Sequence, residues 1–263
     1  MDLGLKDKAA IVSAASRGLG YAVARELAAE GARVMICARD AERVEAARAA
    51  LVAETGADVR AVAADLATTE GIAAVASAAE RAFGQVDILV NNTGGPPSGP
   101  FEKLSWDLWQ REVDNLLRGT VELTRRVLPG MRERKWGRIL NVTSITVKQP
   151  VDGLMLSNSL RAAITGFART LATEVARDGV TVNCILPGFT KTERVEQLSA
   201  ATAEREGLTV AEVNARTEAQ IPMRRIGEPR EFGAMAAFLV SERASYVTGQ
   251  SVAVDGGWIR GLY

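Results

Sequence analysis

Residues 11–20, Ile-Val-Ser-Ala-Ala-Ser-Arg-Gly-Leu-Gly, join a short apolar run to an amphipathic one. The apolar run from Ala9 to Val12 predicts a buried strand, and the run that begins at Tyr21 predicts a helix. Small residues fill the turn between them, which lets the backbone approach a pyrophosphate closely. The N–H groups and the dipole of the helix start also favour an anion. The stretch predicts the first unit of a dinucleotide-binding domain, although such turns also occur for packing alone.

The composition fits one large α/β domain. The chain has 263 residues, and 47% of them are hydrophobic, which is enough for a sizeable core. Lys plus Arg and Asp plus Glu each number 32, so the formal net charge is zero. We therefore expect neither nucleic acid nor an anionic membrane as a partner, because both select basic surfaces. Residues 1–8 lack the apolar run of a secretion signal, and no stretch approaches ~18 apolar residues. These features predict a cytoplasmic protein without a membrane span.

Two residue types limit the chemistry. Cys37 and Cys184 both fall in apparent strands, where we expect buried free thiols in a reducing cytoplasm. The sequence has no histidine, which excludes Ser-His-Asp hydrolysis and the usual zinc sites. No metal site is therefore expected.

Strands and helices alternate along the rest of the chain. Further strands are predicted at 33–38, 59–63, 86–90, 138–142, 180–186 and 251–254. Helices are predicted at about 41–54, 70–83, 106–134, 156–176 and 229–240, with a polar helical segment at 193–220. This alternation predicts a single-domain Rossmann fold over residues 1–263, with a seven-stranded parallel, doubly wound sheet and helices on both faces. Ligands of such sheets bind at the carboxyl ends of the strands.

Polar and glycine-containing motifs stand at those strand ends. They are Ser16-Arg17-Gly18-Leu19-Gly20, Asp65-Leu66, Asn91-Asn92-Thr93-Gly94, Asn115, Ser144, Pro187-Gly188 with Thr192, and the ending Thr248-Gly249-Gln250 with Val254-Asp255-Gly256-Gly257. In this order they resemble the short-chain dehydrogenase/reductase family over essentially the whole chain, most of all the 3-oxoacyl-[acyl-carrier-protein] reductases. The resemblance implies hydride transfer between a nicotinamide cofactor and a carbonyl or alcohol substrate.

The catalytic residues of the family are only partly present. The resemblance implies a serine, a tyrosine, a lysine four residues after the tyrosine, and an asparagine. Ser144 and Asn115 stand at the serine and asparagine positions. Ser157 and Arg161 stand at the tyrosine and lysine positions, at the family's spacing from Ser144. The tyrosines of the chain lie elsewhere, at Tyr21, Tyr246 and Tyr263.

These replacements change the proton chemistry. A serine hydroxyl is far less acidic than a phenol, whose pKa is ~10, and the loss of a general acid typically removes a factor on the order of 10²–10⁴ in rate. Arg161 can still bind ribose hydroxyls but cannot give up a proton.

Two hypotheses follow. In the first, an active reductase holds a water between Ser144, Ser157 and Asn115, and Arg161 stabilises the oxyanion. Lys148 is an alternative donor, although a solvated loop lysine is the plainer interpretation. In the second hypothesis, the chain is a cofactor-binding pseudoenzyme that acts as a sensor or as a partner subunit.

The choice of cofactor follows from the end of the second strand. NAD-binding domains usually carry an acidic residue there, whereas this chain has Arg39, with Arg17 in the glycine turn. Two guanidinium groups suit a 2′-phosphate, so we predict NADP(H). Asp40 is a competing ribose ligand, but a helix cap is the favoured interpretation.

The resemblance also implies the remaining cofactor contacts. They are Ser13, Ser16, Arg17, Gly18 and Leu19 in the first turn, Asp65 and Leu66 at the adenine, Asn92 and Gly94 at the adenosine ribose, Gly188 and Thr190 at the nicotinamide amide beside Pro187 and Thr192, and Arg161 at the nicotinamide ribose. Ala14 replaces a glycine of the family, and we expect it to adopt an ordinary φ with a modest change in the turn.

Two further expectations concern the lid and the assembly. Residues 193–220 lie where the family places its substrate lid, and their polar composition fits a mobile cover. The long helices near 106–134 and 156–176 form the subunit interface in the family, so a homo-oligomer, either dimer or tetramer, is expected. Leu116, Leu117 and Phe167 fit either that interface or the core.

Overall fold

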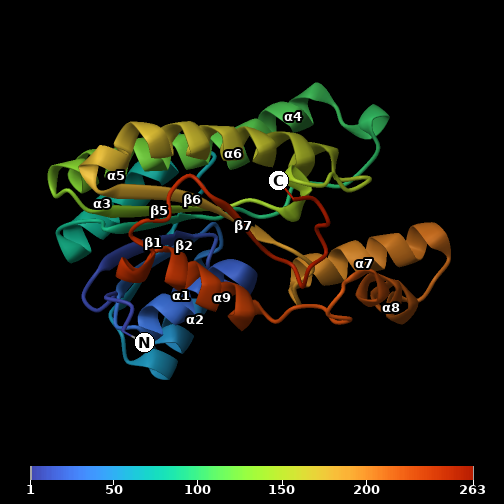
Figure 1. Cartoon of the computed structure of the whole chain (residues 1–263), viewed down its shortest axis with the longest axis horizontal. Coiled ribbons are helices and arrows are strands. Elements are labelled where there is room, and N and C mark those ends of the chain that lie inside the picture. Colours follow the sequence, from blue (N-terminus) through green and yellow to red (C-terminus); the bar gives the residue numbers. More distant parts are fainter. Residues whose placement is uncertain (1, 263) are drawn as a thin grey trace.

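Seven parallel strands form the centre of the molecule (Figure 1). The computed structural model describes residues 2–262, and within them the strand order is β3-β2-β1-β4-β5-β6-β7. The strands are β1 (Ala9–Ser13), β2 (Arg33–Ala38), β3 (Val59–Ala63), β4 (Ile88–Asn91), β5 (Gly137–Val142), β6 (Val180–Pro187) and β7 (Ser251–Val254). The predicted doubly wound parallel sheet is confirmed.

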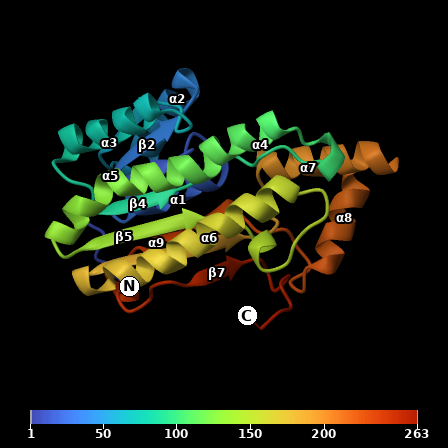
Figure 2. The same cartoon turned by 90° about the horizontal axis from the view of Figure 1, so that it is seen from above.

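Helices cover both faces of this sheet (Figure 1, Figure 2). They are α1 (Gly18–Ala29), α2 (Ala41–Thr55), α3 (Thr69–Phe83), α4 (Trp106–Glu112), α5 (Gly119–Glu133), α6 (Met155–Val175), α7 (Glu193–Glu206), α8 (Val210–Gln220) and α9 (Pro229–Leu239). None of these helices is both long and apolar enough to cross a bilayer. Side-chain oxygens cap several helix starts, as sequence rules predict for Asp40, Thr68, Ser105, Thr192 and Thr209.

The alternation of side chains along β1 divides the core into two layers. Ala10 and Val12 pack with residues of α1, α2 and α9 on one face. Ala9 and Ile11 pack with residues of α3, α5 and α6 on the other face. Both faces are buried, which explains why the strands are continuous apolar runs in the sequence.

The two cysteines lie in this core. Cys37 and Cys184 are buried and free, and burial raises the pKa of each thiol to about 12. Such thiols are structural rather than reactive, which confirms the prediction of buried free thiols.

Two segments expected to be single helices are divided. The segment 106–134 consists of α4, one π-helical stretch at Val113–Arg118 and α5. Apolar spacing alone does not distinguish this wider turn from an α-helical one, so the division was not predicted. The segment 193–220 is divided at Gly207, whose φ of 67° ends α7, and α8 begins with a reciprocal capping box between Thr209 and Glu212.

The carboxyl edge of the sheet is the part of the fold that positions the candidate site. The strand order reverses between β1 and β4, which lie side by side. Loops after such a switch point diverge, which leaves room for a ligand. Figure 2 shows α7 and α8 together at the end of the molecule toward which the strands point.

Candidate active site

The turn after β1 is fastened to the end of β4. The buried Ser13 hydroxyl donates to the carbonyl of Asn92 at 2.7 Å and accepts from the Asn92 N–H at 2.8 Å. The Asn92 side-chain amide donates in turn to the carbonyl of Ala14 at 3.2 Å. Ser13 and Asn92 therefore hold the backbone of the first turn in place.

This turn is too crowded for a side chain at its last glycine. A Cβ added to Gly20 would lie 2.4 Å from the Ala14 carbonyl oxygen and 2.7 Å from Asn92 Nδ2. Gly18 has a φ of 60°, a conformation natural to glycine. The close backbone packing at Gly20 and the glycine conformation at Gly18 fit the cradle that a dinucleotide pyrophosphate requires.

Ala14 departs from the expectation of an ordinary φ. Its φ is 46°, so it adopts the left-handed conformation that a glycine would adopt without strain. That conformation costs an L-residue about 1–2 kcal/mol. The hydrogen bond from Asn92 to the Ala14 carbonyl helps to hold it, and the turn keeps its shape despite the added methyl group.

Arg39 and Asp65, predicted at the 2′-phosphate and the adenine, follow β2 and β3. Arg39 is exposed directly after β2. Asp40 accepts a hydrogen bond from the N–H of Arg43 at 3.0 Å and caps α2, which confirms the cap interpretation. Asp65 accepts from the N–H of Ala67 at 3.0 Å and so shapes the turn that precedes α3.

The loop after β6 meets the first turn from the opposite side. Thr192 caps α7, and its Cγ2 lies 3.7 Å from the place of a Cβ on Gly18. Gly188 needs its small size because a Cβ there would lie 2.6 Å from Asp255 Cα. Two distant motifs are thereby brought together.

One ion pair also crosses between these two motifs. The guanidinium of Arg17 contacts the carboxylate of Glu193, the first residue of α7. Both side chains are about half exposed, so the pair adds little stability. It does engage one of the two arginines predicted to bind a 2′-phosphate.

Ser144 and Ser157 stand on two elements that pack together, the turn after β5 and the start of α6. The Ser144 oxygen accepts from the N–H of Thr146 at 3.1 Å, which leaves its own proton free to donate. Ser157 is buried. Three residues close to these serines in the sequence have buried side-chain oxygens that make no hydrogen bond in the described chain: Thr143 Oγ1, Thr146 Oγ1 and Asn158 Oδ1.

Arg161 crosses from α6 to the end of β5. Its Nη1 donates to the carbonyl of Val142 at 2.8 Å, and its Nη2 to the carbonyl of Gly94 at 3.5 Å. Burial, together with the charge of the neighbouring Arg194, lowers the pKa of Arg161 to about 10, and Glu112 opposes this shift. The guanidinium thus lies between the end of β5 and the loop that follows β4.

Two charged residues of this region were not predicted. Buried Glu112 accepts from the side-chain amide of Asn115 at 3.2 Å. Arg194 donates through Nη2 to the carbonyl of Pro96 at 2.6 Å, and burial lowers its pKa. Their only sequence signals are local: Glu112 is one helical turn before Asn115, and Arg194 follows the Pro187–Thr192 motif.

None of the described tyrosines takes the place of the missing one. Tyr21 packs against the core layer of α1, α2 and α9, and Tyr246 is fully exposed. Tyr263 lies outside the described residues. Lys148 is exposed directly after the 3₁₀ turn at Ile145–Val147, as a solvated loop lysine would be.

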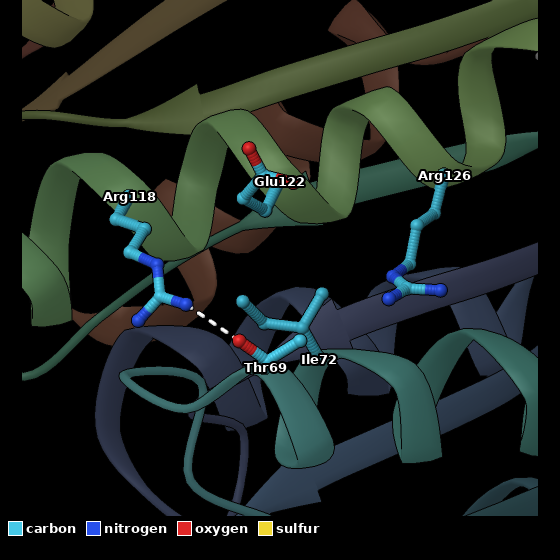
Figure 3. Close-up of a pocket in the computed structure, with 5 residues that line it drawn as sticks. All are labelled: Thr69, Ile72, Arg118, Glu122 and Arg126. Carbon is cyan, nitrogen blue, oxygen red and sulfur yellow. Dashed lines mark hydrogen bonds between the residues drawn. The ribbon is translucent and has the colours of Figure 1, made fainter.

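A separate small hollow lies between α3 and α5 (Figure 3). Arg118 reaches across it and donates to the Thr69 hydroxyl at 2.6 Å. Its volume of about 30 Å³ is about a tenth of that of a small ligand pocket. It contains none of the predicted site residues, and the candidate site remains the carboxyl edge of the sheet.

The fold and this edge define a dinucleotide-binding α/β protein, and comparisons with known proteins identify its family. A family model described as enoyl-(acyl carrier protein) reductase matches residues 13–259. The 3-oxoacyl-[acyl-carrier-protein] reductase of Vibrio cholerae is 34% identical over 255 residues, 97% of this chain and 98% of its own. Dehydrogenase/reductase SDR family member 4 of Oryctolagus cuniculus is 34% identical over 254 residues, 96% of this chain and 94% of its own. The chain belongs to the short-chain dehydrogenase/reductase family.

Solved structures agree with this assignment. L-sorbose reductase from Gluconobacter frateurii, complexed with NADPH and L-sorbose, is similar with a TM-score of 0.94 and 35% identity, with all of both chains covered. An actinorhodin polyketide ketoreductase with NADPH is similar with a TM-score of 0.93 and 33% identity, over 98% of each chain.

Proposed function

We propose that this protein is an NADP(H)-dependent oxidoreductase that transfers a hydride between nicotinamide and a carbonyl or alcohol substrate, a 3-oxoacyl thioester or a related ketone. The observation that carries the proposal is the meeting of the glycine turn with Thr192 at the carboxyl edge of the sheet. The similar L-sorbose reductase and polyketide ketoreductase both hold NADPH. When bound, the cofactor supplies or accepts the hydride.

The first turn and its neighbours would hold the cofactor. The backbone N–H groups at the start of α1 suit the pyrophosphate. Arg39 suits a 2′-phosphate, and Arg17 joins it once it leaves Glu193. Asn92 and Gly94 would adjoin the adenosine ribose, and Gly188 with Thr190 the nicotinamide amide.

The protein's own part in the chemistry is to place the carbonyl and handle its proton. The Ser144 hydroxyl, whose oxygen already accepts a backbone N–H, would donate to the substrate oxygen. Ser157 and Asn115 would hold a water that delivers the proton. Arg161 would stabilise the developing negative charge, because it carries a cation in a buried site.

The lid and the assembly are proposals of the same kind. Residues 193–220 would cover the bound substrate, since α7 already contacts the first turn through Glu193 and the 94–96 loop through Arg194. A homo-oligomer formed through α5 and α6, and a cytoplasmic location, remain predictions.

A cofactor titration followed by a substrate panel tests the proposal. NADPH should quench protein fluorescence on binding and bind more tightly than NADH. A panel of ketones, 3-oxoacyl thioesters and quinones should then reveal NADPH oxidation. Ser157→Ala should slow that turnover, while Ser159→Ala, on the exposed side of the same helix, should leave it unchanged.

The outcomes separate the alternatives. NADPH binding without turnover on any compound would favour the sensor or partner-subunit hypothesis. If none of the four nicotinamide nucleotides binds, both hypotheses are wrong.

A further inference from the structure

Two arginines enclose the loop that follows β4. Arg161 reaches from α6 to the carbonyl of Gly94 at 3.5 Å, and Arg194 reaches from α7 to the carbonyl of Pro96 at 2.6 Å. The Arg194 guanidinium also lies beside Gly95, whose added Cβ would come within 2.5 Å of Nε. Two cationic groups from distant elements therefore meet at one short loop.

Neither cation has a carboxylate partner in residues 2–262. No described carboxylate oxygen lies within 4.0 Å of either guanidinium, although many surface arginines of the chain are paired, such as Arg225 with Glu231. Arg161 is only 6% exposed. Buried charges are normally paired because desolvation is costly. Binding an anion would therefore offset the free-energy cost of burying these two guanidinium groups.

One acidic group, Glu112, acts on both arginines and balances only part of their charge. Glu112 favours the charged form of both arginines, but its carboxylate accepts from Asn115. One negative charge beside two positive charges leaves a net positive site. Arginine forks match a carboxylate with two parallel hydrogen bonds.

We infer that Arg194, supported by the charge of the neighbouring Arg161, binds a carboxylate carried by the substrate, so that the preferred substrate is an oxo acid rather than a neutral ketone. The inference rests on the proposed function for the reaction itself. Arg161 also binds the carbonyl of Val142, two residues before Ser144, so the anion would lie near the carbonyl that Ser144 receives. The resemblance puts the cofactor phosphates at the turn after β1 and the uncharged nicotinamide ribose at Arg161, so on this arrangement neither would supply the anion.

A calorimetric comparison of acids with their esters tests the inference. The full chain is saturated with NADP⁺, which cannot reduce a ketone, and titrated with 4-oxopentanoate, 3-oxocyclohexanecarboxylate and the methyl ester of each. At least one acid should bind about tenfold or more tightly than its ester. Arg194→Gln should abolish that preference, and the matched control Arg205→Gln, an exposed arginine on the same helix, should keep it. Glu112→Gln should increase it.

Several results would overturn the inference. Equal affinities for acid and ester, or no binding of any of the four compounds, would do so. So would a loss of NADP⁺ affinity in Arg194→Gln with the acid-to-ester ratio unchanged, because the anion would then be a cofactor phosphate. If the wild-type chain binds no nucleotide, the proposed function fails. The same comparison of acids with esters, made without NADP⁺, then tests the carboxylate site by itself.

Discussion

The turn after β1 and the start of α6 lie at the same carboxyl edge of the sheet, yet they are stabilised in opposite ways. In the first turn, polar groups pair with one another: Ser13, Asn92 and the Ala14 carbonyl form a closed set of hydrogen bonds. On α6, Arg161 is buried without a carboxylate partner in the described chain. In the turn after β5, which α6 packs against, the buried hydroxyls of Thr143 and Thr146 make no hydrogen bond in that part of the chain either.

This difference separates a scaffold from a reactive site. A closed set of hydrogen bonds fixes a backbone shape that a cofactor can use repeatedly. Unpaired buried polar groups destabilise the folded protein, and proteins retain such groups where a ligand or a reaction uses them. The first turn has the form that a cofactor cradle requires, and we predict that the proton-donating half of the site departs from the family at Ser157 and Arg161.

The largest expected effect comes from restoring the family's tyrosine and lysine at positions 157 and 161. The double variant Ser157→Tyr with Arg161→Lys restores a phenol and a lysine, so kcat for a neutral ketone should rise by a factor on the order of 10². Stopped-flow NADPH oxidation measures this rate, with NADPH affinity as the control. No gain in a folded, NADPH-binding variant would mean that these positions are not equivalent to the family's pair.

The next effect concerns stability. Arg161→Met should raise the free energy of unfolding by about 1–2 kcal/mol, because removing an unpaired buried charge outweighs two lost hydrogen bonds. Urea unfolding measures the change, and Arg169→Met, an exposed position on α6, should show no gain.

The difference in unfolding free energy between Arg161→Met and the wild-type protein should depend on pH. Burial depresses the pKa of Arg161 from 12.5 to about 10 in the native state, so below pH 10 the charged form is held in both states and its penalty is complete. Above pH 10 the native protein releases this proton before the unfolded chain does, and the penalty falls. The expectation that Arg161 cannot give up a proton therefore holds only below that pH. The gain in unfolding free energy from Arg161→Met should therefore shrink as the pH rises through 10. A gain that grows instead would contradict a lowered pKa for Arg161.

A smaller effect is expected in the first turn. Glu193→Gln removes the partner of Arg17, so Arg17 becomes free to bind a 2′-phosphate and NADPH affinity should rise about two- to fivefold. NADH affinity should not change, nor should NADPH affinity in the control Glu196→Gln, also exposed on α7. Equal gains for both nucleotides would point to a general loosening of α7 instead.

The smallest effect tests the strained alanine. Ala14→Gly removes the left-handed strain at φ 46° and should stabilise the protein by about 0.5 kcal/mol, after the greater freedom of glycine in the unfolded chain is subtracted. Thermal unfolding measures it. Ala15→Gly, buried and with an ordinary φ, should destabilise the protein; a loss at Ala14 as well would mean that the turn is not strained.

Much of the fold follows from the sequence because both faces of the sheet are buried. The strands are apolar runs, the helices have amphipathic spacing, and caps such as Asp40 and Thr68 are recognisable. The motifs at the strand ends follow from the same pattern, since parallel strands bring their carboxyl ends to one edge.

The remaining features depend on contacts between distant segments. Ala14 is left-handed because the turn closes against Asn92, 78 residues away. Arg194 resembles a solvated residue in a polar segment, and only the fold brings it to Pro96 and the vicinity of Arg161. Glu112 likewise gains its role from burial, which its neighbours in the sequence do not reveal.

The π-helical stretch at Val113–Arg118 determines how the side chains of α4 are rotated about the helix axis relative to those of α5. A π turn takes up one residue more than an α turn, which rotates the subsequent side chains by about 100°. Within this stretch, Leu116 packs with Leu160 and Ile164, and the neighbouring Asn115 donates a hydrogen bond to Glu112. Deleting one residue there would make an unbroken α-helix. It would also rotate either Glu112 or the buried residues of α5 away from their present neighbours.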